Sequence, residues 1–163
     1  MYIIIVGLGG IGQNLATIAV AEKHNVVAVD TNAGKCKDIA LMCDLVTITG
    51  DATRPGVLEE AGISEADALI TTTGSDAVNL IVTMQARKKG VKNIRTIVND
   101  REHLDLFNQE GITVHKNPNV IVAEDIYNAM LRPNISDFVS LAGGKAEILK
   151  IDIRDKTRAN GKM

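Results

Sequence analysis

A glycine-rich turn that directly follows a β-branched run is the feature that most constrains this chain. Residues 2–6 read Tyr-Ile-Ile-Ile-Val, and the six residues after them include four glycines. An apolar run without alternation is typical of a buried parallel strand, and an apolar helical pattern begins at Ile11. The order strand, tight turn, helix is the context in which Gly-x-Gly-x-x-Gly predicts dinucleotide binding.

The three glycines of this motif have separate physical roles. Gly7 permits the sharp turn off the strand, Gly9 lets a pyrophosphate approach the backbone, and Gly12 lets the helix pack closely against the strand. The helix N-terminus adds unpaired N–H groups and a partial positive charge for phosphates. An ordinary strand–turn–helix connection without a ligand is the alternative interpretation.

Asp30 strengthens the nucleotide-binding interpretation. It lies 18 residues after Gly12, at the end of the apolar run 26–29. A carboxylate at this place accepts hydrogen bonds from ribose hydroxyls and repels a 2′-phosphate, so NAD, ATP or ADP is favoured over NADP. The alternative is that Asp30 only caps the next helix.

Strands and helices alternate along the chain. The expected strands are 2–6, 26–29, 45–48, 68–72, 94–98 and 112–115, and the expected helices are 11–23, 33–43, 55–62, 76–89, one capped by Asn99 or Asp100 that ends before Gly111, and 118–131. This alternation predicts an α/β fold with a doubly wound, six-stranded parallel sheet of the Rossmann-like type. Residues 140–144 are loop-like, and 146–153 are expected to form a half-exposed strand.

Ligands in such sheets bind at the carboxyl ends of the strands. The loops at 50–53 and 72–76 reach the same edge as the glycine-rich turn and Asp30. Asp51 and Asp76 have an alternative role as helix caps. The three histidines, at positions 24, 103 and 115, have no metal-ligand spacing and are expected to be solvated or locally bonded.

Composition excludes several functional classes. The 163 residues carry a net charge of −2 and only 2% aromatic residues, which gives no support for nucleic-acid binding. No apolar run approaches the ~18 residues of a transmembrane helix, and the N-terminus is a strand rather than a signal peptide. We therefore expect a cytoplasmic protein without direct membrane insertion. No catalytic triad or substrate domain is evident, so no enzymatic activity is expected.

Several segments together resemble the N-terminal nucleotide-binding domain of the TrkA/KTN (RCK) family, the cytoplasmic regulators of potassium transporters and channels. The resemblance rests on the turn 7–12, Asp30, Gly50-Asp51-Ala52-Thr53, the run 59–63 before 66–68, Thr73-Gly74-Ser75-Asp76 with Asn79-Leu80, and Asn117-Pro118. It covers about residues 1–133, the expected nucleotide-binding domain. Residues 134–163 are then a linker and the start of a truncated C-terminal lobe.

The resemblance implies NAD(H) as the ligand, with ATP, ADP or AMP as alternatives. The implied contacts are Gly7, Leu8, Gly9, Gly10, Ile11 and Gly12 at the phosphates, Asp30 and Thr31 at the adenosine ribose, Asp51, Ala52 and Thr53 at the adenine, Thr73 and Gly74 on the far side, and Asn99 and Arg101 at the distal end. Many relatives carry arginine where this chain has Gly10, which weakens the case for a triphosphate.

The function implied by the resemblance is that of a regulatory subunit. It would lie at the inner face of the membrane, gate a potassium-translocating membrane subunit, and form a homodimer or larger oligomer. The segment 118–131 has more apolar residues than one sheet face would bury, which favours exchange with a second copy. Folding of residues 139–153 over this helix is the alternative. The competing functions are the cofactor-binding part of an NAD-dependent oxidoreductase and a redox-sensing transcription factor, although no basic helix-turn-helix is evident.

Overall fold

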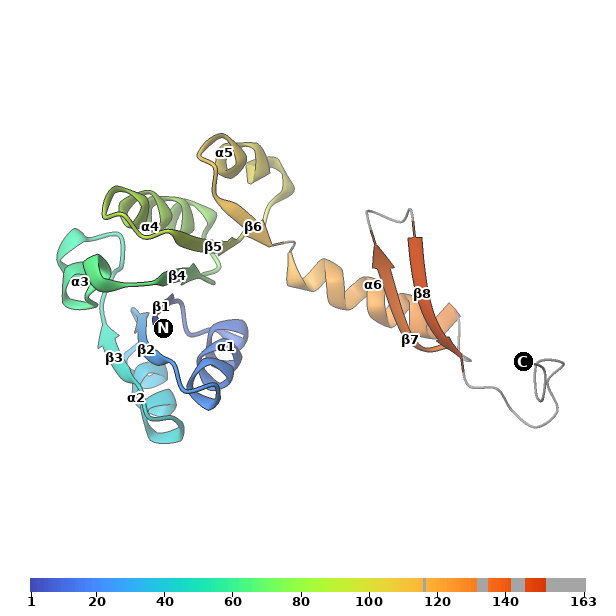
Figure 1. Ribbon diagram of the computed structural model, residues 1–163, viewed down its shortest axis with the longest axis horizontal. Coiled ribbons are helices and arrows are strands. Elements are labelled where there is room, and N and C mark those ends of the chain that lie inside the picture. The colour runs from blue at the N-terminus through green and yellow to red at the C-terminus, as the bar shows by residue number, and fades with distance from the viewer. Residues whose placement is uncertain (116, 132–134, 142–145, 152–163) are drawn as a thin grey trace, which may run out of the picture. The chain divides into compact units, whose positions relative to one another are not determined.

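The computed structural model describes residues 1–115, 117–131, 135–141 and 146–151 (Figure 1). The chain forms two compact units, Met1–Asn117 and Pro118–Met163. The predicted domain boundary after Pro133 stays a prediction, and Pro133 itself, residues 152–153 of the predicted last strand, and the C-terminal segment 154–163 lie outside the described residues.

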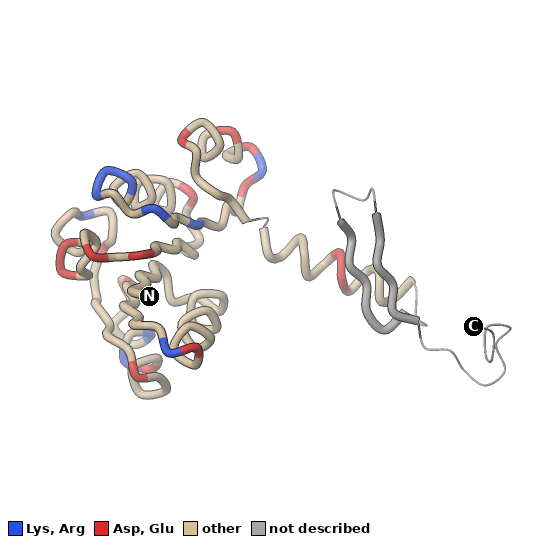
Figure 2. The backbone as a smooth tube through the Cα atoms, viewed as in Figure 1, with Lys and Arg blue, Asp and Glu red and all other residues tan. Residues whose placement is uncertain are grey.

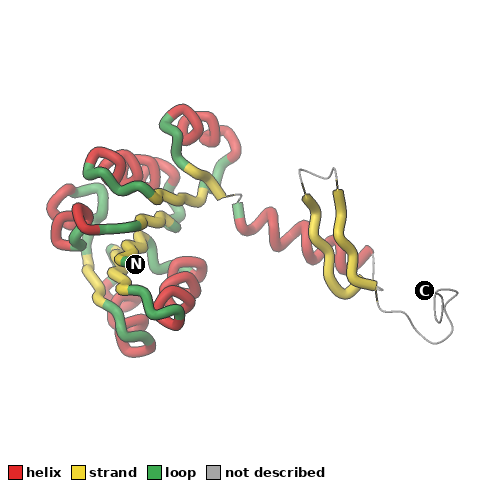
Figure 3. The backbone as a smooth tube through the Cα atoms, viewed as in Figure 1, coloured by secondary structure: helices red, strands yellow, loops and turns green. Residues whose placement is uncertain are grey.

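The first unit is a six-stranded parallel sheet with the strand order β3-β2-β1-β4-β5-β6. Its strands are β1 (Tyr2–Val6), β2 (Asn25–Asp30), β3 (Val46–Thr49), β4 (Ala68–Thr71), β5 (Asn93–Ile97) and β6 (Thr113–His115). Its helices are α1 (Gly10–Ala21), α2 (Ala33–Met42), α3 (Pro55–Glu60), the 3-10 turn η1 (Ile63–Glu65), α4 (Asp76–Lys88), the 3-10 turn η2 (Arg101–His103) and α5 (Leu104–Gln109). The predicted doubly wound fold is confirmed (Figure 3).

Strand register determines where the loops meet. Val6 at the end of β1 pairs with Val29 of β2 and with Thr71 of β4, and Asp30 pairs with Thr49 of β3. The carboxyl ends of these four strands are therefore level. The strand order reverses at the pair β1 and β4, and such a switch point is where nucleotides bind in open α/β sheets.

The apolar core lies on both faces of the sheet because successive residues of β1 point in opposite directions. Ile4 is fully buried with Leu58 of α3 and Val82 of α4, whereas Ile5 is fully buried with Ala16 of α1 and Ile39 of α2. Burial of a side chain of this size contributes about 1.5–3 kcal/mol. The unbroken apolar run of β1 is thus explained by its central place between two helical layers.

Local signals set most helix ends. Pro55 is the first residue of α3, and Gly62 after it has a φ angle of +67°. Ser75 caps α4 by accepting a hydrogen bond from the N–H of Val78. The last turn of α4 is basic while its first turn is acidic (Figure 2), which complements the helix dipole. The single helix expected after β5 is instead a 3-10 turn followed by the short helix α5, with Asp100 as the cap.

The second unit consists of α6 (Pro118–Leu131) and an antiparallel pair, β7 (Ile135–Leu141) and β8 (Ala146–Ile151). The predicted bounds of α6 are confirmed, and the last predicted strand is present over 146–151. The strand β7 was not predicted, and the expectation of a loop at 140–144 is wrong for Ser140 and Leu141, which belong to this strand and pair with β8. The pairing has a register shift between Ile135 and Asp137. Within the described part of the chain, no helix is both long enough and apolar enough to span a membrane.

Candidate nucleotide-binding site

A cleft of about 430 Å³ opens at the carboxyl ends of β1, β2, β3 and β4 of the first unit. Its walls come from the loops after β1, β2, β3 and β4, as the sequence predicts for this sheet edge. The lining residues are Val6, Gly7, Gly9, Val29, Asp30, Thr31, Lys35, Gly50, Asp51, Ala52, Thr72, Thr73, Gly74, Ser75 and Val78.

The glycine-rich turn has the geometry that each predicted glycine role requires. Gly7 has a φ angle of +97°, which favours glycine, and a Cβ atom on Gly12 would lie 1.8 Å from the carbonyl oxygen of Gly7. A Cβ on Gly9 would meet no atom within 4 Å. The sharp turn and the close helix–strand contact are therefore confirmed. The space beside Gly9 is open to the cleft.

Asp30 stabilises the glycine-rich turn by hydrogen bonding and also lines the cleft. Its carboxylate accepts a hydrogen bond of 2.6 Å from the N–H of Leu8 and one of 2.8 Å from the N–H of Asn32. The cap of α2 is Asn32, whose side chain accepts from the N–H groups of Gly34 and Lys35. The alternative role of Asp30 as a helix cap is therefore wrong.

The loop after β3 holds its own carboxylate in place. Asp51 accepts hydrogen bonds from the hydroxyl of Thr53, at 2.7 Å, and from its N–H, at 2.9 Å. These bonds hold the pKa of Asp51 below its ordinary value. The first helical turn of α3 is preceded by Arg54 and has no side-chain cap, so Asp51 does not cap that helix. Gln85 of α4 donates to the carbonyl of Thr53 and fixes the loop from the opposite side.

The loop after β4 is fixed by Asn79, which is fully buried on α4. The side-chain oxygen of Asn79 accepts from the hydroxyl of Thr73 at 2.7 Å and from its N–H at 3.2 Å. Its amide nitrogen donates to the carbonyls of Thr73 and Ile97, both at 3.1 Å. A single buried side chain therefore satisfies polar groups of the loop after β4 and of β5 at once.

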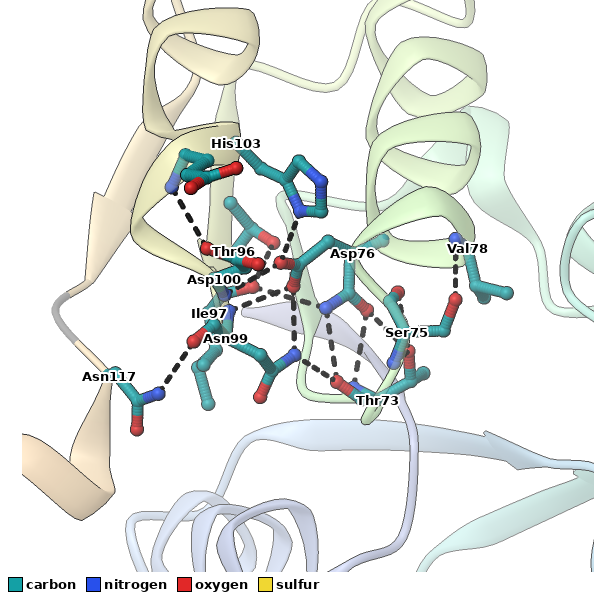
Figure 4. A network of polar contacts seen from close by, with 12 residues as sticks. Thr73, Ser75, Asp76, Val78, Thr96, Ile97, Asn99, Asp100, His103 and Asn117 are labelled. Carbon is teal, nitrogen blue, oxygen red and sulfur yellow. Dashed lines mark hydrogen bonds and ion pairs between the residues drawn. The ribbon is translucent and has the colours of Figure 1, made fainter.

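Asp76 joins α4 to the loop after β5 (Figure 4). Its carboxylate accepts from the N–H groups of Asn99 and Asp100, from the side-chain amide of Asn99, and from Nδ1 of His103, all at 2.8–2.9 Å. Burial of Asp76 opposes ionisation, but the four hydrogen bonds outweigh it and lower its pKa. The bond to Asp76 raises the pKa of His103.

Two expectations about these residues are corrected. Asp76 neither lines the cleft nor caps α4, whose cap is Ser75. His103 is exposed, as one of the two expected alternatives, but its bond is not local, since its partner Asp76 is 27 residues away in the sequence. The tertiary fold makes this pair, and no spacing rule for single helices or turns identifies it.

The predicted contact residues divide into two groups. Eight of them line the cleft: Gly7, Gly9, Asp30, Thr31, Asp51, Ala52, Thr73 and Gly74. The others lie beside it: Leu8 is buried in the core, Gly10 and Ile11 are exposed at the start of α1, Gly12 contacts Gly7, Thr53 bonds Asp51, Asn99 bonds Asp76, and Arg101 is exposed on η2.

Seven lining residues were not among the predicted contacts: Val6, Val29, Lys35, Gly50, Thr72, Ser75 and Val78. Thr72 donates a 2.8 Å hydrogen bond to the carbonyl of Gly7 and so joins the β4 loop to the glycine-rich turn. Thr72 is the last residue of the predicted strand 68–72, and this position at the ligand-binding edge of the sheet could have identified it from the sequence. Lys35 lies in the first turn of α2, where the sequence alone gives no indication that it faces the cleft. Among the described residues, no group of His, Cys, Asp and Glu side chains is arranged to hold a metal ion.

A doubly wound parallel sheet with a glycine-rich turn, and an acidic residue at the end of β2, defines a Rossmann-like domain of the nucleotide-binding class. The family model described as the TrkA-N domain matches residues 3–118. The chain belongs to the TrkA-N domain family. This finding confirms the family resemblance drawn from the sequence.

Two curated relatives carry the name Trk system potassium uptake protein TrkA homolog. The one from Methanothermobacter thermautotrophicus is 32% identical over 154 residues, which cover 94% of this chain and 71% of the relative. The one from Archaeoglobus fulgidus is 30% identical over 166 residues, which cover 99% of this chain but 38% of the relative. The chain therefore spans well under half of the second relative.

Solved structures share the fold. The Shewanella denitrificans Kef CTD in its AMP-bound form has a TM-score of 0.70 at 22% identity, covering 82% of this chain and 83% of that one. The GsuK channel bound to NAD has a TM-score of 0.62 at 22% identity, covering 69% and 21%. ChuY, an anaerobilin reductase from Escherichia coli O157:H7, has a TM-score of 0.52 at 22% identity, covering 67% and 61%.

Proposed function

We propose that this chain is the nucleotide-binding regulatory part of a potassium uptake system or channel. It would act in the cytoplasm, at the inner face of the membrane, on a potassium-translocating membrane subunit. Family membership and the names of the relatives support this role. The observation that carries the proposal is the cleft, where the open backbone at Gly9 lies next to the carboxylate of Asp30.

The proposed ligand is NAD(H) or an adenine nucleotide, with NADP bound much more weakly. The carboxylate of Asp30 favours free ribose hydroxyls over a 2′-phosphate. The absence of a side chain at Gly10 gives a triphosphate no cation at that place. The AMP-bound and NAD-bound structures of similar fold are consistent with either ligand size.

Calorimetric titration of NAD, NADH, AMP, ADP, ATP and NADP tests the ligand directly. We expect Gly9→Val to abolish binding, because the added side chain occupies the space of the phosphates, and to leave the thermal melt unchanged, because a Cβ meets no atom there. Gly56→Val is the matched control, since Gly56 on α3 is equally unobstructed and lies outside the cleft lining. Retained binding in Gly9→Val, or NADP bound as tightly as NAD, contradicts the proposal.

Regulation requires a ligand that stabilises one arrangement of the assembly over another. We propose that α6 supplies the contact between two copies. Its apolar side chains are exposed, including Ile126 at 66% and Met130 at 68%, and large apolar patches are rare on monomers. Such a helix, flanked by Pro118 and Pro133, is suited to pivot as a rigid body.

Light scattering tests this assembly. We expect a homodimer at micromolar concentration, and we expect Ile126→Asp to give a monomer or aggregate. Ile18→Asp is the matched control, because Ile18 on α1 is exposed to a similar extent, at 61%. A monomeric unmodified chain contradicts the dimer and leaves the fold-back of residues 139–153 as the alternative.

The fold similarity to a reductase supports one competing function, the cofactor-binding part of an NAD-dependent oxidoreductase. The cleft lining contains no His, Tyr or Cys side chain to act as a general acid, and its titratable groups are Asp30, Lys35 and Asp51. A hydride-transfer assay with bound NADH decides between the two, since turnover contradicts a purely regulatory role.

A further inference from the structure

The polar network around Asn99 connects the cleft wall to the end of the first unit. The side-chain amide nitrogen of Asn99 donates to the carbonyl of Thr73 at 3.1 Å and to Asp76 at 2.8 Å. The carbonyl oxygen of Asn99 accepts from the side-chain amide of Asn117 at 2.7 Å (Figure 4). Thr73 lines the cleft, and Asn117 immediately precedes Pro118, the first residue of α6.

Asp76 determines the orientation of Asn99. One carboxylate oxygen, Oδ1, accepts from both the main-chain N–H and the side-chain amide of Asn99, each at 2.8 Å. The other oxygen, Oδ2, accepts from the N–H of Asp100 and from His103, both at 2.9 Å. Asp76 is buried, with 8% of the residue exposed, and it holds partners that lie at the surface. An amide nitrogen has two hydrogens, and Asp76 takes one while Thr73 takes the other.

The position of this network matters for a ligand with two nucleotides. A dinucleotide crosses the switch point of a doubly wound sheet, with one nucleotide over each half. The first half of the cleft contains Asp30 and Asp51, at the ends of β2 and β3. The second half contains Thr73, Gly74 and Ser75, after β4. Asn99 supports this second wall from behind and is not itself part of the lining.

We propose that Asn99, held by Asp76, is a positioning residue for the second nucleotide of a bound dinucleotide. Through the same residue, the cleft wall at Thr73 and the joint at Asn117 form one hydrogen-bonded frame. The inference rests on the proposed nucleotide-binding function and extends it in two ways. It assigns the selection of a dinucleotide over a mononucleotide to residues outside the cleft, and it extends the hydrogen-bonded frame from the cleft to Asn117, the last residue of the first unit.

The variant Asn99→Asp tests the ligand selection. It replaces the amide donor by an oxygen of the same size, which repels the carbonyl of Thr73 and the carboxylate of Asp76. We expect the affinity for NAD to fall by about tenfold or more, while the affinity for AMP changes by less than about threefold. Asn108→Asp on α5 is the matched control, with an exposed side chain, and is expected to change neither affinity.

Equal losses for NAD and AMP overturn the proposal, because they indicate general damage to the cleft. An unchanged NAD affinity also overturns it. If the unmodified chain binds neither nucleotide, the proposed function fails instead, and a measurement without ligand then tests the frame alone. If the aspartate variant does not fold, the affinities of Asn99→Ala for NAD and AMP are compared with those of the unmodified chain instead.

Hydrogen exchange of the ligand-free protein tests the hydrogen-bonded frame without any nucleotide. We expect Asn99→Asp to accelerate amide exchange by about tenfold in the peptides containing Thr73 and Asn117. Thr73 loses its side-chain donor, and repulsion from Asp76 displaces the main-chain carbonyl of residue 99 to which Asn117 donates. Asn108→Asp is expected to change neither peptide. Acceleration in only one of the two peptides, or in neither, contradicts a shared frame.

Discussion

Two walls of the same sheet edge are held by different kinds of interaction. The glycine-rich turn after β1 is fixed by close steric contact, with Gly12 against Gly7 and the side chain of Leu8 fully buried. The loops after β4 and β5 are fixed by buried polar groups, with Asn79 and Asp76 bonded to several backbone atoms. The turn therefore depends on the absence of side chains, and the second wall depends on the presence of particular ones.

Each wall resists a different kind of perturbation. Steric packing between backbone atoms does not change with protonation, but it tolerates no added methyl group. A network of carboxylate, amide and imidazole tolerates small shifts, but it depends on ionisation. Substitutions in the two walls are therefore expected to differ in size and in pH dependence.

Gly12→Ala is expected to have the largest effect. The new methyl carbon would lie 1.8 Å from a backbone oxygen, so α1 has to move away from β1. We expect a loss of about 3 kcal/mol or more in the free energy of unfolding, measured by chemical denaturation. Gly9→Ala is the matched control and is expected to change stability by less than about 1 kcal/mol, because its Cβ meets no atom. Similar losses in both variants contradict the steric account of the turn.

Asp76→Ala is the corresponding change in the second wall. It removes the buried carboxylate that accepts from the N–H groups of Asn99 and Asp100 in partly buried hydrogen bonds. We expect a loss of about 2–4 kcal/mol in the free energy of unfolding. Asp105→Ala on α5, whose side chain is exposed, is the control and should change stability by less than about 0.5 kcal/mol. A loss no larger than that of the control shows that packing alone holds this wall.

Thr72→Val probes the hydrogen bond that joins the two walls. The hydroxyl of Thr72 donates to the carbonyl of Gly7, and valine keeps the shape while removing the donor. We expect a loss of about 1 kcal/mol in the free energy of unfolding. Thr113→Val, at an exposed position of β6, is the control. If Thr72→Val is as stable as the unmodified chain, the two walls are independent of each other.

The pH dependence of stability is the smallest expected effect and separates the walls by mechanism. The pKa of Asp76 is lowered, so its contribution is present above the ordinary value of 3.8 and is lost as the pH falls through the folded pKa. The pKa of His103 is raised, so its contribution is present below 6.5 and is lost as the pH rises through the folded pKa. The pair therefore contributes most between these two ordinary values.

Denaturation of the unmodified chain and of His103→Gln on both sides of pH 6.5 measures this effect. We expect the difference in stability between the two proteins to be largest on the acid side and to shrink as the pH rises. The difference between Gly9→Ala and Gly12→Ala is expected to be the same at each pH. A constant difference for His103→Gln contradicts the charged pair with Asp76.

The fold class and the glycine-rich wall of the site follow from local patterns in the sequence. The central strands were predictable because a strand buried between two helical layers is an unbroken β-branched run. The roles of Gly7 and Gly12 were predictable because they depend on the backbone of one continuous segment. Asp30 was predictable for the same reason, since the end of a strand places it.

Tertiary structure alone decided the rest. The pairing of Asp76 with His103 and the contact between Asn99 and Thr73 join segments that are more than 20 residues apart, through side chains whose types are common on protein surfaces. The strand β7 and its register shift depend on hydrogen bonds to β8. The hydrophobic pattern of a segment reflects the secondary structure of that segment. Contacts between distant polar side chains leave no such period in the sequence, because they are fixed only when the strand order places two loops side by side.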